Sequence, residues 1–200
     1  MKTRSCQGHV LVVSLVLLLA ITTIGIASIG DVTINERVAT NYRDSNLSFQ
    51  AAEAALREGE IRAETLAVTH LWTNFINTCT GNDCFTPVCN NGLCFSGNYT
   101  SANSCTTVPP ATPIWEIPST WSSNGVAATV ATNFPNLVES PKYIIEFMCF
   151  VPVDPDTNPN PTSNYPGVDW SYMYRVTGYS LGEGGSSTIA VQSTYKVDPI

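Results

Sequence analysis

Charged residues are scarce in this 200-residue chain: they make up 12% of it, with 9 Lys and Arg against 16 Asp and Glu. The net charge of −7 and the absence of a basic stripe leave no positive surface to neutralise phosphates. No polybasic cluster that would bind anionic lipid headgroups flanks the apolar run. Nucleic acid is therefore excluded as an expected partner.

Residues typical of catalytic and cofactor sites are equally few. The chain has 2 histidines, and His70 has no serine or cysteine partner at a spacing that suggests nucleophilic catalysis. No HExxH zinc motif and no phosphate-cradling glycine loop occurs. We therefore expect no enzyme activity, no cofactor and no metal site, and interpret His70 as a surface or packed residue.

Proline is absent from the first 77 residues, whereas all 13 prolines follow them. The composition separates a short basic head (1–8), an apolar run (9–30), a segment rich in Ala, Glu, Arg and Leu (31–77), and a remainder rich in Pro, Gly and Cys (78–200). Nothing polar divides the second region from the third, so both are predicted to form one long helix. Gly59 marks a candidate bend or end of that helix.

The third region carries an apolar stripe on a helical period. Its members recur at steps of three, four or seven residues: Ile34, Val38, Tyr42, Phe49, Ala52, Leu56, Ala63 and Leu66. The fourth region predicts strands at 143–151, 171–180 and 187–197, with a glycine-rich hairpin connection between the last two. The first strand is apolar on both faces and is expected at the centre of the sheet. The predicted fold is α+β, with an antiparallel sheet packed on the helical stripe.

Six of the seven cysteines follow the apolar run: Cys79, Cys84, Cys89, Cys94, Cys105 and Cys149. Cys6 lies before the run, so its removal, or its retention on the cytoplasmic side, leaves an even set for disulfides in an oxidising compartment. The equal spacing of the first four also invites a metal site, although zinc ligands more often occur as closer pairs. Disulfides are favoured, the fifteen possible pairings remain open, and Cys149 is expected to tie the loop to the sheet.

The apolar run at 9–30 admits three interpretations. A secretory signal would be cut near residues 25–27, but the apolar core exceeds the usual length of about 7–15 residues and continues into helix. A transmembrane anchor needs about 20 apolar residues, and Lys2 and Arg4 would orient its N-terminus to the cytoplasm. Neither interpretation explains why Gly8 stands immediately before the run.

A short basic leader ending in Gly8, followed at once by an apolar helix that becomes amphipathic, resembles a type IV prepilin. The resemblance implies that a membrane-bound prepilin peptidase cuts between Gly8 and His9 and that the new N-terminus of His9 is methylated. It also implies that the retained helix anchors the subunit in the inner membrane and later packs in the core of a filament.

The resemblance extends to the PilX family of type IV pilus assembly proteins. Its most specific part joins NYRD (residues 41–44) to FQAAEAALR (residues 49–57). The residues that carry this motif are Asn41, Arg43, Asp44, Phe49, Gln50, Glu53 and Arg57. PKYIIEF and YRVTGYSLGEGGSSTIAVQSTYKV are similar to the closing strands of the family, whereas residues 78–140 resemble nothing that we can name.

Two residues depart from the usual pilin pattern. Most pilins carry glutamate at the fifth mature position, where this chain has Val13. That glutamate is thought to pair with the N-terminal amine of an adjacent subunit, and a buried amine without a partner is costly. PilX-like proteins share the lack with a tip-located pseudopilin, which implies a minor, priming or tip-proximal subunit. His9 replaces the usual phenylalanine and is expected to lower processing or methylation efficiency.

The implied function is that of a minor pilin that helps to initiate or assemble a type IV pilus. The implied partners are other minor pilins, the major pilin and a large tip-associated adhesin. The implied location is the inner membrane, with the C-terminal domain in the periplasm, and then the pilus at the cell surface. Two alternatives remain: a pseudopilin of a type II secretion system, and a membrane-anchored adhesive module whose cysteine-rich loop binds a ligand.

Two further patterns have plainer interpretations. Alternating Asp and Asn residues from Asp154 to Asn160 resemble the start of a calcium-binding loop. Pro159 and Tyr165, however, replace the glycine and glutamate of such a loop. A solvated loop is therefore the favoured interpretation of residues 154–165. The charged residues of AEAALREGEIRAE predict a solvated helix face, with Glu53 and Arg57 paired at i, i+4. A contact of this face with neighbouring subunits is the open alternative.

Overall fold

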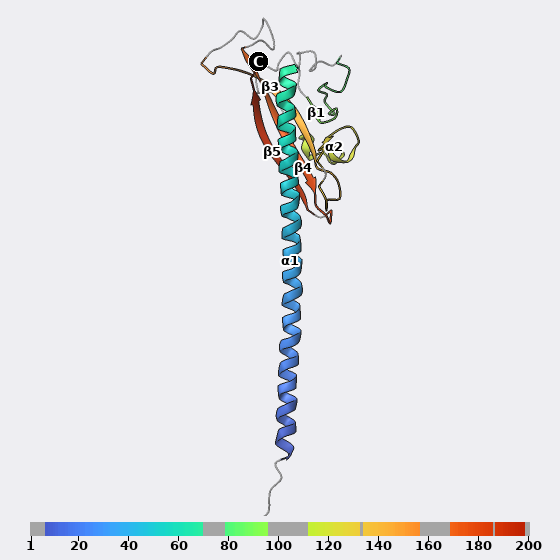
Figure 1. Ribbon diagram of the computed structural model, residues 1–200, viewed down its shortest axis with the longest axis vertical. Helices are drawn as coiled ribbons and strands as arrows, with labels where there is room; N and C mark the ends of the chain where they lie inside the picture. Colours follow the sequence, from blue (N-terminus) through green and yellow to red (C-terminus); the bar gives the residue numbers. More distant parts are fainter. Residues whose placement is uncertain are drawn as a thin grey trace, which may run out of the picture. The chain divides into compact units, whose positions relative to one another are not determined.

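The computed structural model describes residues 7–69, 79–95, 112–132, 134–156, 169–185 and 187–198. One long helix, α1 (Gln7–Thr69), comes first, and the strands of a single sheet follow it (Figure 1). The chain forms two compact units, Met1–Arg43 and Asp44–Ile200. The second unit holds the C-terminal part of α1 and the sheet, and it has the expected α+β fold.

Helix α1 runs without interruption through Gly59. Gly59 is a point of close packing rather than an end, because a Cβ atom placed on it would lie 2.5 Å from Cγ1 of Val176 in the sheet. The buried small residues Ala51, Ala55 and Ala63 follow the same four-residue spacing along the helix. The FQAAEAALREGE segment therefore presents a ridge of small side chains that lets the helix backbone approach the sheet closely.

The sheet has the strand order β1-β3-β4-β5, and β2 also pairs with β3. The strands are β1 (Leu93–Cys94), β2 (Ala128–Thr129), β3 (Lys142–Pro152), β4 (Trp170–Leu181) and β5 (Thr188–Val197). The three long strands are antiparallel, as predicted, and β3 is flanked on both edges. The short strand β1 pairs with β3 in parallel, so the sheet is mixed.

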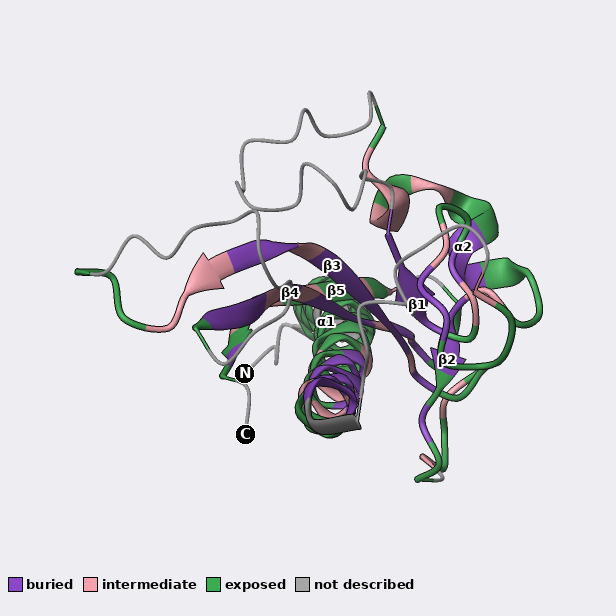
Figure 2. Ribbon diagram, turned by 90° about the horizontal axis from the view of Figure 1, so that it is seen from above, coloured by how far each residue is buried: buried purple, intermediate pink, exposed green. Residues whose placement is uncertain are grey.

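The two faces of the sheet bury different clusters of side chains. One face packs on α1, with Leu56, Tyr143, Ile145, Tyr174 and Val176 in the same hydrophobic cluster. The other face is covered locally by a smaller cluster around Ile144, which includes Trp121 of α2 (Pro118–Ser122) and partly buried Trp115 of the 3-10 helix η3 (Ile114–Glu116). Figure 2 shows the long strands above the helix end, with β1, β2 and α2 gathered at one side.

The predicted apolar stripe of the helix divides into a buried and an exposed part. Ala52, Leu56, Ala63 and Leu66 are buried in the second unit. Ile34, Val38, Tyr42 and Phe49 are exposed, and Phe49 retains 47% of its accessible surface. The sheet thus accounts for the buried half of the stripe only, and the exposed half is a candidate contact surface.

Candidate functional site

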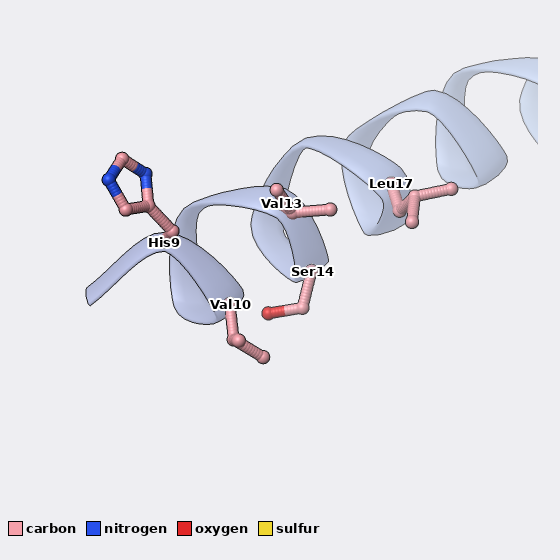
Figure 3. A pocket seen from close by; sticks show the side chains of 5 residues that line it. All are labelled: His9, Val10, Val13, Ser14 and Leu17. Carbon is pink, nitrogen blue, oxygen red and sulfur yellow. The ribbon is translucent and has the colours of Figure 1, made fainter. Parts of the chain in front are cut away.

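The first turns of α1 present apolar side chains on every side. The described side chains from His9 to Ala27 are all exposed, and Val13 retains 58% of its accessible surface. Figure 3 shows Val13 one turn after His9, followed by Leu17 along the helix. After His9 the sequence offers no carboxylate before Asp31. An N-terminal amine at His9 would therefore find no acidic partner in the neighbouring turns of its own helix.

The three hydroxyl side chains between His9 and Ala27 are satisfied within the helix. The hydroxyls of Ser14, Thr22 and Thr23 donate hydrogen bonds of 2.9 Å to the carbonyl oxygens of the preceding turn. These three hydroxyls thus need no outside partner, which suits a helix surrounded by lipid or by other apolar helices. By length and composition, α1 contains a segment able to cross a membrane, and none of that segment is buried inside the protein.

Asp44 of the NYRD motif fastens the β4–β5 turn to the helix. Its Oδ1 atom accepts a 2.6 Å hydrogen bond from the backbone N–H of Glu183, and the adjacent Gly182 leaves no room for a Cβ beside the carboxylate. One turn further along the helix, fully buried Ser48 accepts a 3.1 Å hydrogen bond from the hydroxyl of Ser187. The two contacts give Asp44 and the glycine-rich turn a shared structural role.

The other residues that carry the family motif point outward: Asn41, Arg43, Phe49, Gln50, Glu53 and Arg57 are all exposed. Arg57 forms its ion pair with Glu60, at 3.3 Å, and not with Glu53 as the spacing had predicted. Glu60 is held in place because it also accepts a 2.7 Å hydrogen bond from Ser193 of β5. The charged segment is therefore partly structural, and its Phe49 side remains open for contacts.

The cysteine-rich segment is crosslinked between near neighbours. Disulfides join Cys79 to Cys84 and Cys89 to Cys94, so the expectation of disulfides in this loop is confirmed. Cys149 of β3 is also disulfide-bonded. Cys105 lies outside the described residues, as does His70.

The Cys89–Cys94 ring is docked on the edge of β3 by backbone hydrogen bonds. Gly92 accepts one from Ile145 and donates one to Val126, both at 2.6 Å. The backbone N–H of Asn91 donates to the carbonyl oxygen of Gly125 at 2.6 Å. The carbonyl oxygen of Asn91 accepts a 2.7 Å hydrogen bond from the side chain of Arg62 in α1. The ring therefore occupies an edge of β3 that would otherwise offer free backbone groups.

Possible metal ligands are spread apart in the described part of the chain. No group of three or more His, Cys, Asp or Glu side chains there could hold a metal ion. In the calcium-like segment, the Oδ1 of Asp154 accepts a 3.0 Å hydrogen bond from the N–H of Asp156, which forms a local turn. Asn158, Asn160 and Tyr165 lie outside the described residues.

One partly buried charged cluster was not singled out from the sequence. Arg175 of β4 donates two hydrogen bonds to Glu146 of β3, at 2.8 and 2.9 Å, and its guanidinium lies 3.8 Å from the ring centroid of Trp115. The pair is a cross-strand neighbour pair in the register of the sheet. Opposite charges within two strands of the predicted sheet were the available signal.

Comparison with known protein families matches both ends of the chain. Residues 7–57 match the family described as PilX N-terminal. Residues 90–197 match the family described as Type IV pilus assembly protein PilX C-term. The second match extends into 90–140, where the sequence had suggested no relative, and it includes β2 and all of the docked ring except Cys89.

Neither a curated protein nor a solved structure matches the chain. The two family matches nevertheless cover more than half of the chain, and both name the same family. The chain belongs to the PilX family of type IV pilus assembly proteins.

Proposed function

We propose that the protein is a minor pilin that helps to initiate a type IV pilus from a tip-proximal complex. The observation that carries the proposal is Val13, which stands in an exposed apolar helix where most pilins have glutamate. A subunit without this carboxylate cannot neutralise the N-terminal amine of a neighbour at that position. Such a subunit is poorly suited to repetition along a filament and better suited to its start.

Maturation and location form part of the same proposal. The leader 1–8 is removed after Gly8, and His9 becomes a methylated N-terminus. Lys2 and Arg4 hold the leader on the cytoplasmic side of the inner membrane, because basic residues are retained there. The head then lies in the periplasm, where the disulfides Cys79–Cys84 and Cys89–Cys94 are stable.

The proposed partners are other minor pilins, the major pilin and a large tip-associated adhesin. Contact with the pilins involves the apolar helix 9–30 and the exposed part of the stripe, which includes Tyr42 and Phe49. These side chains are too large and too exposed to be left without a covering surface in an assembled filament. No reaction is required, since assembly rests on the packing of helices.

Mass spectrometry of the mature N-terminus tests the proposal. A protein isolated from producing cells should begin at methylated His9, and a Gly8→Arg variant should retain the leader. A start near Ser28, or an intact Met1 in the wild-type protein, would refute the processing step. Restoration of pili by the wild-type gene in a strain that lacks it, and failure by Gly8→Arg, would support a role in assembly.

Two alternatives make different predictions. A pseudopilin of a type II secretion system would restore protein secretion and not surface pili. A membrane-anchored adhesive module would lose binding when residues 79–105 are deleted, with piliation unchanged. Presence of the gene among minor-pilin genes rather than secretion genes would favour the proposed function.

A further inference from the structure

The chain contains two Asn-Gly pairs, Asn91–Gly92 and Asn124–Gly125, which lie beside each other but in different environments. In an Asn-Gly sequence the glycine nitrogen can attack the asparagine side chain, because glycine has no side chain to hinder the approach. The reaction needs only water and a free, mobile glycine N–H. The two pairs therefore react at different rates if the glycine N–H is held by a hydrogen bond in one pair and is free in the other.

The backbone of Asn91–Gly92, including the Gly92 N–H that would react, is held by hydrogen bonds. The Gly92 N–H donates to the carbonyl oxygen of Val126 at 2.6 Å, and the Asn91 N–H donates to that of Gly125 at 2.6 Å. The Asn91 carbonyl accepts a bond from Arg62. A Cβ on Gly92 would lie 2.8 Å from that of Ala128, so the surroundings leave no space for rearrangement.

Asn124–Gly125 is held at the Gly125 carbonyl, which accepts the bond from Asn91, but not at the Gly125 N–H that reacts. Both residues are exposed, and among the described residues no atom beyond the immediate chain neighbours lies within 4 Å of a Cβ placed on Gly125. Within the described part of the chain, no hydrogen bond engages the Gly125 N–H. Gly125 has a φ of 77°, the left-handed conformation of a turn that glycine adopts without strain.

We propose that Asn124 is a site of spontaneous deamidation and isomerisation in the folded head, and that Asn91 is protected. The Gly125 nitrogen forms a bond to Cγ of Asn124 and loses its proton. The side-chain NH₂ group of Asn124 takes up that proton and leaves as ammonia, which gives a cyclic imide. Water then opens the cyclic imide at either carbonyl and gives aspartate or isoaspartate at position 124. No oxidant, reductant or enzyme is involved.

The product changes the anchoring of the disulfide ring. The carbonyl groups of Gly125 and Val126 are the acceptors that hold Asn91 and Gly92. Isoaspartate adds one methylene group to the backbone immediately before these acceptors, which shifts them out of register with their donors. The Cys89–Cys94 ring is then held on that side less firmly, so the modification would loosen the sheet edge with the age of the protein.

Peptide mapping of the purified full-length protein in detergent tests the inference. After incubation at mildly alkaline pH and 37 °C, conversion at Asn124 should be at least about ten times faster than at Asn91, because only local opening exposes Asn91. In urea the two rates should become similar. An isoaspartate-specific methyltransferase should label the folded wild-type protein and label an Asn124→Gln variant much less.

Three results would overturn the inference. These are equal conversion of the two asparagines in the folded protein, faster conversion of Asn91, and unchanged labelling of Asn124→Gln. Hydrogen exchange checks the structural consequence separately. The Asn91 and Gly92 amides should exchange faster in the converted fraction than in the unconverted one, and equal exchange would refute the loosening of the ring.

Discussion

Asp44 and Glu183 lie 139 residues apart in the sequence, and the carboxylate of the first accepts a 2.6 Å hydrogen bond from the backbone N–H of the second. The contact joins the N-terminal family motif to the glycine-rich turn between β4 and β5. Both segments resembled the same family in the sequence, and the structure supplies a physical reason for their occurrence together. Asp44 is also the first residue of the second compact unit.

Removal of the Asp44 carboxylate should destabilise the head. Asp44→Ala leaves the Glu183 N–H without its charged acceptor, and hydrogen bonds to charged groups contribute about 1.5–3 kcal/mol. Urea unfolding of the full-length protein in detergent, followed by tryptophan fluorescence, measures the change. Asp44→Asn keeps an oxygen acceptor and should lose less. Equal losses in the two variants would show that the hydrogen bond is not the cause.

The role of Asp44 could not be predicted from the sequence alone. Helical periodicity placed it on α1, and turn residues predicted the hairpin, but no local pattern states which helical residue meets which turn. The same limit applies to β1 and β2, which are two residues long and are defined by pairing with β3. By contrast, the predicted bounds of the three long strands differ from those observed by at most one residue.

Gly178 should tolerate no larger residue. A Cβ at this position would collide with the backbone of α1 at Ala52 and Leu56, which cannot move aside as a flexible side chain can. Gly178→Ala is therefore expected to lower the free energy of unfolding by about 1–3 kcal/mol, the usual cost of overpacking. Urea unfolding checks this, with Ala190→Val on the exposed face of β5 as the control. A urea midpoint of Gly178→Ala equal to that of the wild type would contradict the close approach of β4 to the backbone of α1.

The packing of helix on sheet shows a second limit of the sequence. The helical period correctly predicted that Ala52, Leu56 and Ala63 lie on the packed face, but Gly59 was predicted to be a bend or end of the helix. In the structure, Gly59 instead packs closely against the side chain of Val176. Periodicity records which side chains are apolar, whereas the distance between two backbones depends on which residues are small at facing positions. That information exists only once strand and helix are paired.

Loss of the Tyr174 hydroxyl should be neutral or stabilising. The ring is fully buried between Phe85, Phe147 and Tyr172, and burial raises the pKa of the Tyr174 hydroxyl. Within the described part of the chain, this hydroxyl has no hydrogen-bond partner. Because an unsatisfied buried group costs about 1–3 kcal/mol, Tyr174→Phe should raise the free energy of unfolding or leave it unchanged.

The control for this prediction removes the ring as well. Tyr174→Ala should cost about 3–5 kcal/mol, as is usual when a buried aromatic side chain is truncated to alanine. Chemical unfolding in urea compares both variants with the wild type. A clear loss of stability in Tyr174→Phe would show that the hydroxyl has a partner.

Acid should remove a contribution to stability that depends on Asp198. The hydrogen bond from Ser171, at 2.5 Å, and the nearby Lys196 lower the pKa of Asp198 from its ordinary value of 3.8. A carboxyl whose pKa is lower in the folded state stabilises the fold above the unfolded value and loses that effect as the pH falls through the folded value. The wild type should therefore be more stable than Asp198→Asn at neutral pH.

The difference between the wild type and Asp198→Asn should shrink as the pH falls below 3.8, because Asp198 then becomes protonated and resembles asparagine. Urea midpoints measured across the acid range provide the comparison. Ser171→Ala removes the main cause of the shift, so Asp198→Asn should have a smaller effect in that background at neutral pH. If the effect of Asp198→Asn is independent of pH, or is unchanged by Ser171→Ala, the hydrogen bond does not couple folding to the ionisation of Asp198.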